Sequence, residues 1–328
     1  MKLAVLGTGK IVLDLMNTFD EFPIEKKVLL ATRHSVEKAE KLAAEHNFDH
    51  IYYDYDELLT SDVDTVYVAL PNHLHYAFAK KALEANKHVI IEKPITANYR
   101  ELEELIKIAK EKHLMIIEAV TVHYLPAYLN IKEHLSELGH VRIVSMNYSQ
   151  YSSRYDAFKA GTILPAFDYH KAGGALMDLN VYNLNFVIGL FGEPKHIGYQ
   201  ANVQKGIDTS GIATLDYGDF KAVCIGAKDC KAPVMSTIEG DEGFMAINTP
   251  VNGMQAYHEE DNKGTGRDFI SDVKTHRMYY EFMEFIRMID EQDYDKINEM
   301  LEISKAVSRT MEKARKEAGI VFDNDHQE

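Results

Sequence analysis

Short apolar segments alternate with amphipathic patterns over the first 120 residues of the chain. The apolar segments are Lys2–Leu6, Lys27–Ala31, Ile51–Tyr53, Thr65–Leu70, His88–Glu92 and Leu114–Val120. Between them, apolar residues recur at helical spacing, as in the segment from about Asn98 to Lys112. Strands rich in Val, Ile and Leu that alternate with helices are typical of a parallel sheet covered on both faces. With right-handed crossovers, the pattern predicts a doubly wound α/β domain over residues 1–120.

The pattern changes from about residue 141, where the strand-like segments are joined by hairpin-like turns. These segments are Val141–Gln150, Ile197–Val203, Ile212–Tyr217, Lys221–Ala227, Val234–Glu239 and Phe244–Asn248. Turns such as Tyr217-Gly218-Asp219-Phe220 are typical of antiparallel hairpins. We therefore expect residues 121–328 to form an α+β domain with a large, open, mostly antiparallel sheet. Helices near 124–138 and 173–190 should cover one face of this sheet.

The last part of the chain combines a polar segment with two helical patterns. Thr249–Thr275 is rich in glycine and acidic residues and is predicted to be a solvated loop, with a substrate lid as the alternative. Helices are expected over about His276–Glu291 and Asp295–Ala318. The apolar stripe on the first of these helices indicates packing against a core.

Composition narrows the range of partners and compartments. The chain has 328 residues and a formal net charge of −15, which fits two domains and argues against nucleic acid or an anionic membrane as a partner. The start of the chain lacks the pattern of a signal peptide, and we expect a cytoplasmic protein. The two cysteines, Cys224 and Cys230, are expected to be reduced thiols and not metal ligands.

A glycine-containing segment follows the first predicted strand. Gly7-Thr8-Gly9-Lys10-Ile11 lies at the first strand-to-helix turn, where glycine allows a tight turn and close approach of the backbone to a pyrophosphate. The third glycine of the usual fingerprint would fall at Val12. Its position in the strand–helix alternation favours dinucleotide binding over a purely structural turn, so residues 1–120 are predicted to be a Rossmann domain.

The end of the second strand indicates which dinucleotide is preferred. NAD enzymes place a carboxylate there for the ribose 2′-hydroxyl, whereas this chain reads Ala31-Thr32-Arg33-His34-Ser35, without an acid. Arg33 is suited to pair with the 2′-phosphate of NADP, and Thr32 or Ser35 to donate hydrogen bonds to it. NADP(H) is therefore favoured and NAD(H) stays possible; the alternative is that Arg33 is a solvated surface residue.

Two further segments carry candidate catalytic residues. Lys93 follows the fifth strand within Glu92-Lys93-Pro94, where the nicotinamide is expected; a solvated loop lysine is the alternative. In the segment from Gly173 to Tyr182, a glycine turn followed by a helix would place Asp178 and Tyr182 on one face. A cation beside a phenol favours the phenolate, so Lys93 would help Tyr182 to exchange a proton. The alternative for Tyr182 is an ordinary packed tyrosine.

Together with Pro71-Asn72-His73-Leu74-His75, these segments resemble the Gfo/Idh/MocA oxidoreductases over essentially the whole chain. The resemblance implies that the lysine of the Glu-Lys-Pro motif, here Lys93, is catalytic or orients the substrate. It also implies that the tyrosine at the place of the family's usual histidine, here Tyr182, is the proton donor. This tyrosine is similar to that of dimeric dihydrodiol dehydrogenases and NADP-dependent xylose dehydrogenases. Asn180 replaces the glycine of the family motif.

The same resemblance implies further contacts and an assembly. Leu70, Pro71, Asn72, His75 and Glu92 are expected along the cofactor, with Pro71, Asn72 and His75 near its nicotinamide half. For His75 the alternative is an ordinary residue at the start of a helix. The open face of the second sheet is expected to form the interface of a homodimer or a higher homo-oligomer.

The expected activity is a reversible hydride transfer between NADP(H) and a carbinol carbon of a sugar, polyol or cyclic diol. Tyr182 would exchange the hydroxyl proton, Lys93 would hold the substrate oxygen, and Asp178 would orient Lys93 or bind a neighbouring hydroxyl. The chemistry requires no metal. Two alternatives are a cofactor-binding regulator without turnover and a dinucleotide-assisted glycosidase.

Overall fold

The computed structural model describes residues 1–272 and 276–326. The chain divides into two compact units. The first comprises Met1–Ala119 and Thr275–Glu302, and the second comprises Val120–Lys274 and Ile303–Glu328. In the described part of the chain, every helix is too short or too polar to cross a lipid bilayer.

In the described part of the first unit, six strands form a parallel sheet in the order β3-β2-β1-β4-β5-β6. The strands are β1 (Lys2–Leu6), β2 (Lys26–Leu30), β3 (His50–Tyr52), β4 (Thr65–Val68), β5 (His88–Glu92) and β6 (Ile116–Ala119). The central strands are buried along most of their length, because helices cover both faces of such a sheet. This order confirms the predicted doubly wound arrangement.

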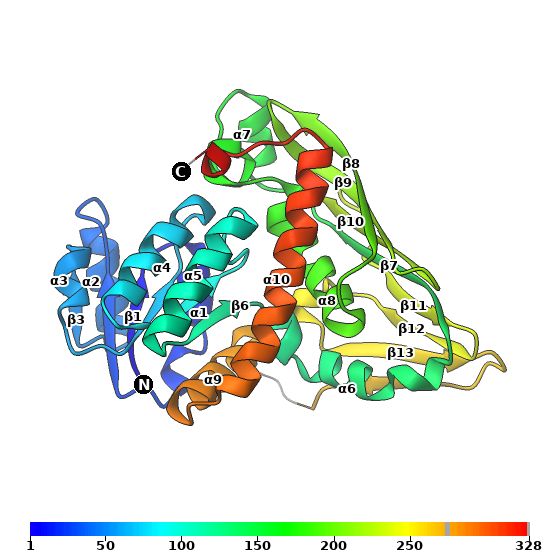
Figure 1. Ribbon diagram of the computed structural model, residues 1–328, viewed down its shortest axis with the longest axis horizontal. Helices are drawn as coiled ribbons and strands as arrows, with labels where there is room; N and C mark the ends of the chain where they lie inside the picture. The colour runs from blue at the N-terminus through cyan, green and yellow to red at the C-terminus, as the bar shows by residue number, and fades with distance from the viewer. Residues whose placement is uncertain (273–275, 327–328) are drawn as a thin grey trace. The chain divides into compact units, whose positions relative to one another are not determined.

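Helices connect these strands and pack on the sheet. They are α1 (Lys10–Leu15), α2 (Val36–Glu45), α3 (Tyr55–Leu59), α4 (His75–Glu84) and α5 (Tyr99–Lys112). The neighbouring helices α4 and α5 pack side by side (Figure 1). Asn98 begins α5 by accepting a hydrogen bond from the Glu101 amide through its side chain, as expected for an N-cap residue.

The helix α9 (Arg277–Asp290) also packs in the first unit. Phe282 on α9 stacks on Phe22, with ring centroids 5.4 Å apart, and meets the ring of Tyr67 edge-on at 5.1 Å. Dividing the sequence at residue 120 assigns α9 to the second domain, whereas the structure assigns it to the first. The apolar stripe on α9 shows that the helix is buried but does not specify which core buries it.

The described residues of the second unit form an eight-stranded sheet in the order β14-β13-β12-β11-β7-β10-β9-β8. The strands are β7 (Val141–Ser149), β8 (His196–Gln204), β9 (Ile207–Asp216), β10 (Lys221–Ala227), β11 (Ser236–Gly240), β12 (Gly243–Ile247), β13 (Ala256–Asp261) and β14 (Gly266–Ile270). Of the neighbouring pairs, only β7 and β10 in this described sheet run parallel. The open, mostly antiparallel sheet predicted from the sequence is therefore confirmed.

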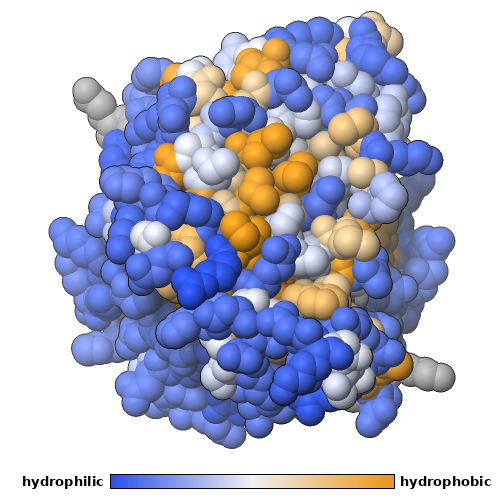
Figure 2. Space-filling model, turned by 90° about the vertical axis from the view of Figure 1, so that its right-hand side faces the viewer, coloured by the Kyte–Doolittle hydropathy of each residue, from blue (hydrophilic) through white to orange (hydrophobic). Residues whose placement is uncertain are grey.

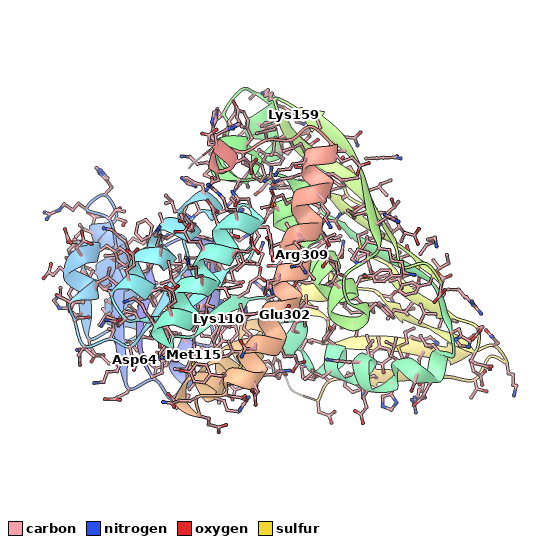
Figure 3. The ribbon with its side chains drawn as sticks, in the orientation of Figure 1. Asp64, Lys110, Met115, Lys159, Glu302 and Arg309 are labelled. Carbon is pink, nitrogen blue, oxygen red and sulfur yellow. The ribbon has the colours of Figure 1, made fainter. Side chains whose placement is uncertain are left out.

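Helices lie on one side of this sheet. They are α6 (Pro126–His134), α7 (Tyr155–Lys159) and α8 (Val181–Phe191), the last of which packs against β7 and β10. A π-helical turn over Leu176–Asn180 leads directly into α8. The long helix α10 (Tyr294–Glu317) contains the boundary between the two units. Arg309, labelled on α10 in Figure 3, forms an ion pair 2.6 Å long with Glu193.

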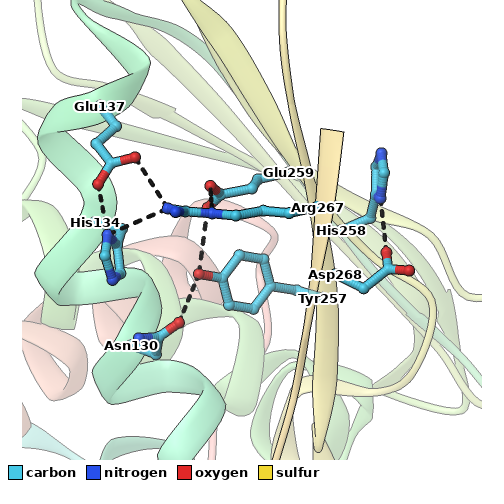
Figure 4. Close-up of polar contacts among 8 residues, drawn as sticks. All are labelled: Asn130, His134, Glu137, Tyr257, His258, Glu259, Arg267 and Asp268. Atoms are coloured by element: carbon cyan, nitrogen blue, oxygen red, sulfur yellow. Dashed lines mark hydrogen bonds and ion pairs between the residues drawn. The ribbon is translucent and has the colours of Figure 1, made fainter. Parts of the chain in front are cut away.

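The prediction of a solvated loop over Thr249–Thr275 is wrong for its central part, which forms the β13–β14 hairpin. The last three residues of the predicted loop lie outside the described part of the chain. Figure 4 shows how the hairpin is attached to α6. Tyr257 donates a 2.8 Å hydrogen bond to Asn130, and Arg267 pairs with Glu259 and with Glu137.

Candidate functional site

The β1–α1 turn contains the two glycines of the predicted dinucleotide site, and their surroundings differ. Gly7 has a φ of +102°, and a Cβ there would lie 3.1 Å from the Ala69 carbonyl oxygen. Glycine alone fits this close approach without strain. At Gly9, which begins α1, a Cβ would meet nothing within 4 Å. The turn therefore leaves open space at Gly9, and Thr8, Lys10 and Ile11 beside it are at least partly exposed.

The end of β2 presents an exposed cation. Arg33 is exposed and forms no ion pair with any residue that the structure describes. The Thr32 and Ser35 hydroxyls lie 3.1 Å apart, and the Ser35 hydroxyl donates to the Thr32 carbonyl oxygen at 3.1 Å. Ser35 thus occupies the N-cap position of α2 without capping it through its side chain. These polar groups follow β2 at the same edge of the sheet as the glycine turn.

His75 joins two of the turns at this edge. Its Nε2 lies 2.8 Å from the Leu70 carbonyl oxygen and its Nδ1 lies 2.9 Å from the Pro94 carbonyl oxygen. Burial lowers the pKa of the imidazole to about 4, against the opposing effect of both backbone contacts. The ring is fully buried, so we assign His75 to holding the turns that contain Pro71, Asn72 and Lys93.

Glu92 and Lys93 point to different environments at the end of β5. Glu92 is buried and accepts a 2.5 Å hydrogen bond from the Tyr67 hydroxyl, whereas Lys93 is partly exposed. Burial raises the pKa of the Glu92 carboxyl group. Glu92 therefore supports the strand end from inside the unit, and Lys93 is the residue of this pair whose side chain is not buried.

Sequence reasoning missed a charged cluster behind Glu92. Glu281 on α9 is fully buried, and its pKa is raised well above the usual value by burial and by the charge of Glu92. Arg277 of the same helix forms a 2.5 Å ion pair with Asp14. The position of a glutamate within the apolar stripe of the predicted helix could have revealed this cluster, because buried carboxyl groups are uncommon without a role.

In the second unit, Tyr182 and Asp178 lie one turn apart where the π-helical turn meets α8. The Tyr182 side chain is buried, and its ring centroid lies 6.2 Å from that of Tyr148. The Asp178 side chain is partly exposed and forms a 2.8 Å ion pair with Lys228. The predicted glycine turn followed by a helix is confirmed, since Gly174 has a φ of +106° directly before this helix.

Asp208 holds the glycine turn in place. This buried carboxyl group accepts hydrogen bonds from the Leu176 amide at 2.6 Å and from the Tyr199 hydroxyl at 2.7 Å. Burial raises its pKa. A Cβ at Gly174 would overlap the Asp208 side chain, so the turn requires glycine for space as well as for conformation. Sequence reasoning did not single out Asp208, because no local pattern links it to this turn.

Asn180, at the place of the family glycine, is seated against β10. Its side-chain amide donates to the Cys224 carbonyl oxygen at 2.9 Å, and a Cβ at Gly226 would crowd it. The backbone at Asn180 is helical, with a negative φ, so the conformation at this position does not require glycine.

The structure therefore gathers most of the predicted cofactor residues at one place. Gly7–Ile11, Thr32–Ser35, Leu70–His75 and Lys93 all follow the carboxyl ends of parallel strands, which meet at one edge of the sheet. Asp178 and Tyr182 belong to the second unit, whereas Lys93 belongs to the first.

Residues 1–120 match the model of an oxidoreductase family with an NAD-binding Rossmann fold. The chain is 33% identical over 329 residues to the NADP(+)-dependent scyllo-inositol 2-dehydrogenase IolU of Bacillus subtilis, covering 99% of each chain. It is 25% identical over 343 residues to the trans-1,2-dihydrobenzene-1,2-diol dehydrogenase of Danio rerio, covering 100% of this chain and 99% of that one.

Among solved structures, the chain resembles KijD10, a 3-ketoreductase from Actinomadura kijaniata in complex with NADP and TDP-benzene. The TM-score is 0.83 at 20% sequence identity, over 96% of this chain and 97% of that one. This likeness shows that the two proteins share a fold.

Proposed function

The chain belongs to the Gfo/Idh/MocA oxidoreductase family, and on that premise we propose that it transfers a hydride between NADP(H) and a carbinol carbon of a sugar, polyol or cyclic diol. Relatives that match over its full length include a scyllo-inositol dehydrogenase and a dihydrodiol dehydrogenase, so the chain is an NAD(P)-dependent oxidoreductase acting on CH–OH groups. The nicotinamide, when bound, supplies or accepts the hydride at C4.

The observation that carries the choice of NADP(H) is the exposed Arg33 at the acid-free end of β2. A guanidinium is always charged and forms paired hydrogen bonds with phosphate oxygens. The Thr32 and Ser35 hydroxyls beside it add donors for the same group. The relative IolU is named for NADP(+), which supports this preference.

The choice of a polyhydroxylated substrate rests on Asp178 and on the named relatives. An ionised carboxylate accepts strong hydrogen bonds from hydroxyl groups, and Asp178 is partly exposed at the end of the glycine turn. Two of the full-length relatives act on an inositol and on a cyclic diol by name. We therefore propose vicinal diols, as in polyols and sugars, as the substrate class.

We assign the proton transfer to Tyr182 and the holding of the substrate oxygen to Lys93. Tyr182 takes the hydroxyl proton as the carbinol is oxidised and returns it when the carbonyl is reduced. In this assignment the Lys93 ammonium binds the substrate oxygen that exchanges the proton with the tyrosine. This proposal requires that both residues reach the same substrate oxygen.

We also propose that the outer face of the second sheet binds a second copy of the chain. Figure 2 shows apolar side chains gathered on this side of the molecule. Ile212 on β9 pairs with Ile225 on β10, and Val223 and Ile143 lie on the same face of neighbouring strands. Ile143 and Ile212 are each 43% exposed, and an apolar sheet face of this kind is typical of an interface. Sedimentation velocity tests the proposal, because a monomer would contradict it.

The proposed activity is tested by the initial rate of NADP⁺ reduction across aldoses, polyols including scyllo-inositol, and trans cyclic diols, with NAD⁺ alongside. We expect turnover that is faster with NADP⁺. Tyr182→Phe should lower kcat by about 100-fold or more, since it removes the acid–base group. Tyr217→Phe is the matched control, because the Tyr217 hydroxyl is bonded only to the Gly192 carbonyl oxygen among the described residues.

Full activity of Tyr182→Phe would contradict the acid–base assignment. Binding of NADPH without turnover of any substrate would favour a regulator. Release of a sugar without a net change in NADPH would favour a glycosidase.

A further inference from the structure

A lysine with a buried side chain lies beneath Asp178. Lys228 directly follows β10, and its side chain is 2% exposed, whereas that of Asp178 is 37% exposed. The Lys228 Nζ lies 2.8 Å from the Asp178 Oδ2 and donates to the Ala166 carbonyl oxygen at 2.5 Å. It also lies 4.4 Å from the centre of the Phe167 ring. The ammonium is thus enclosed on the interior side of the carboxylate.

A buried ammonium requires a counterion, because its desolvation is costly without one. Of the neighbouring acids, Asp208 is bonded to Leu176 and Tyr199; burial raises its pKa, and the nearby Lys228 charge acts in the opposite direction. Asp229, the next residue along the chain, accepts hydrogen bonds from the Thr209 and Ser210 hydroxyls through its Oδ2. Asp178 is the acid in direct ion-pair contact with Lys228, so it is the main counterion.

The pair has a clear orientation. The Lys228 side chain is buried, whereas the Asp178 side chain is partly exposed, so the carboxylate is the member of the pair that a solute can reach. A cation at this position favours the ionised carboxylate and fixes its direction through the contact with Oδ2. Neither effect depends on a bound ligand.

We propose that Lys228 is a positioning residue that keeps Asp178 ionised and aimed at the substrate hydroxyl next to the reacting carbon. The inference rests on the proposed function and narrows it. Substrates with a hydroxyl on the neighbouring carbon have a higher kcat/KM because of this pair, and analogues that lack this hydroxyl do not. Lys228 itself touches no reacting atom in this scheme.

The chain offers a control in Lys205, which is matched to Lys228 in its contacts although it is exposed. Its Nζ donates to the Phe158 carbonyl oxygen at 2.6 Å and lies 4.5 Å from the centre of the Phe158 ring. These are the same two kinds of contact that Lys228 forms with Ala166 and Phe167. Within the described residues, Lys205 forms no ion pair with a carboxylate, so Lys205→Gln removes an anchoring lysine without affecting Asp178.

The test compares Lys228→Gln, Lys205→Gln, Asp178→Asn and the double variant Lys228→Gln/Asp178→Asn. Glutamine keeps a donor for the Ala166 carbonyl and removes the charge. We expect Lys228→Gln to lower kcat/KM roughly 10- to 100-fold on a vicinal diol, the range for one charge-assisted hydrogen bond. The loss should be several-fold smaller on the deoxy analogue. Lys205→Gln should match the wild-type protein on both substrates.

Two readouts separate positioning from a purely structural role. The acid limb of the kcat/KM profile should move to higher pH in Lys228→Gln, because the carboxylate has lost its cation. When Asp178 is already Asn, adding Lys228→Gln should lower kcat/KM by less than about a further threefold, because the effects of two coupled residues are not additive. If Lys228→Gln does not fold, Lys228→Met, neutral and of similar length, serves for the same measurements.

The inference would be overturned if the acid limb of the kcat/KM profile did not move in Lys228→Gln. It would also be overturned if the loss of kcat/KM in the double variant equalled the product of the losses in the two single variants. That result is distinguishable from failure of the proposed function, in which the wild-type protein itself reduces no NADP⁺ on any substrate. In that case the inference about Lys228 fails together with the proposed function on which it rests. Collapse of Tyr182→Phe together with unchanged Lys228→Gln kinetics would reject the role of Lys228 alone.

Discussion

The Nδ1 atom of His75 lies 2.9 Å from the carbonyl oxygen of Pro94, directly after Lys93 in the chain. The same buried ring faces the Leu70 carbonyl oxygen through Nε2. The buried ring therefore lies between the turn after β4 and the turn after β5 and ties them together; because neutral imidazole carries one N–H, it donates to one of the two carbonyl oxygens and packs against the other. Both turns lie at the carboxyl edge of the sheet and carry predicted cofactor residues, so His75 fixes the position of these residues relative to one another.

His75→Leu is expected to weaken NADP(H) binding and turnover and to lower the free energy of unfolding by about 1–3 kcal/mol, the usual cost of leaving a buried polar group without its partner. His88→Leu is the control. The His88 Nδ1 accepts a hydrogen bond from the Met115 amide at the opposite end of β5, so its loss should lower stability alone. Fluorescence titration with NADPH measures the affinity, and an unchanged affinity in folded His75→Leu would contradict the assignment.

The stability contributed by neutral His75 should depend on pH. Burial lowers its pKa to about 4, compared with about 6.5 in an unfolded chain. The folded protein binds this proton less readily, so the stabilisation is complete above pH 6.5 and declines as the pH falls from 6.5 towards 4. Between pH 7 and pH 5, urea unfolding should show the wild-type protein losing about 2 kcal/mol more than His75→Leu. Equal losses would show that His75 does not titrate in this way.

Arg33→Ala should reduce the preference for NADP⁺ over NAD⁺ by roughly 10- to 100-fold in kcat/KM, because one charge-assisted contact with the 2′-phosphate is removed. The rate with NAD⁺ should change little. Lys38→Ala, at an exposed position on α2, removes a nearby charge of the same sign and should leave the preference intact. Retention of the preference in Arg33→Ala would assign the choice of cofactor to other residues.

Gly174→Ala should destabilise the second unit more than Gly161→Ala. Both glycines have positive φ values, +106° and +100°, and alanine there costs about 1–2 kcal/mol. At Gly161 a Cβ meets nothing within 4 Å, whereas at Gly174 it would overlap Asp208. Overpacking should add about 1–3 kcal/mol at Gly174. Guanidinium unfolding of both variants measures the difference. Equal stabilities would mean that the Asp208 side chain moves away from the new methyl group without a cost in stability.

The attachment of the β13–β14 hairpin to α6 and the turn that follows it should depend on salt at one contact and not at the other. Arg267 is 58% exposed, so Arg267→Gln should cost less than about 1 kcal/mol at low ionic strength and still less in 1 M NaCl. Tyr257 is 4% exposed and donates to Asn130, so Tyr257→Phe should cost about 1 kcal/mol at either salt concentration. A salt-independent effect of Arg267→Gln would show that Arg267 contributes to stability mainly through packing of the aliphatic part of its side chain.

Local patterns predicted most strands, in several cases to the residue, as for Lys2–Leu6, His88–Glu92 and Lys221–Ala227. Each is a short apolar run that ends at a polar residue, glycine or proline, and burial preference is read directly from such runs. The β13–β14 hairpin was missed because it lies at the sheet edge, where most side chains stay at least partly exposed and no apolar alternation is required.

The sequence by itself determined the glycine turn, the acid-free end of β2, the position of Lys93 and the helix that carries Asp178 and Tyr182. These features depend on residue type and spacing within one strand–turn–helix segment. Only the tertiary structure decided that α9 belongs with the first unit, that His75 joins two turns, and that Lys228 is the counterion of Asp178. The physical reason is that burial and pairing of a charged group depend on which distant segments pack together, and periodicity along the chain carries no information about that choice.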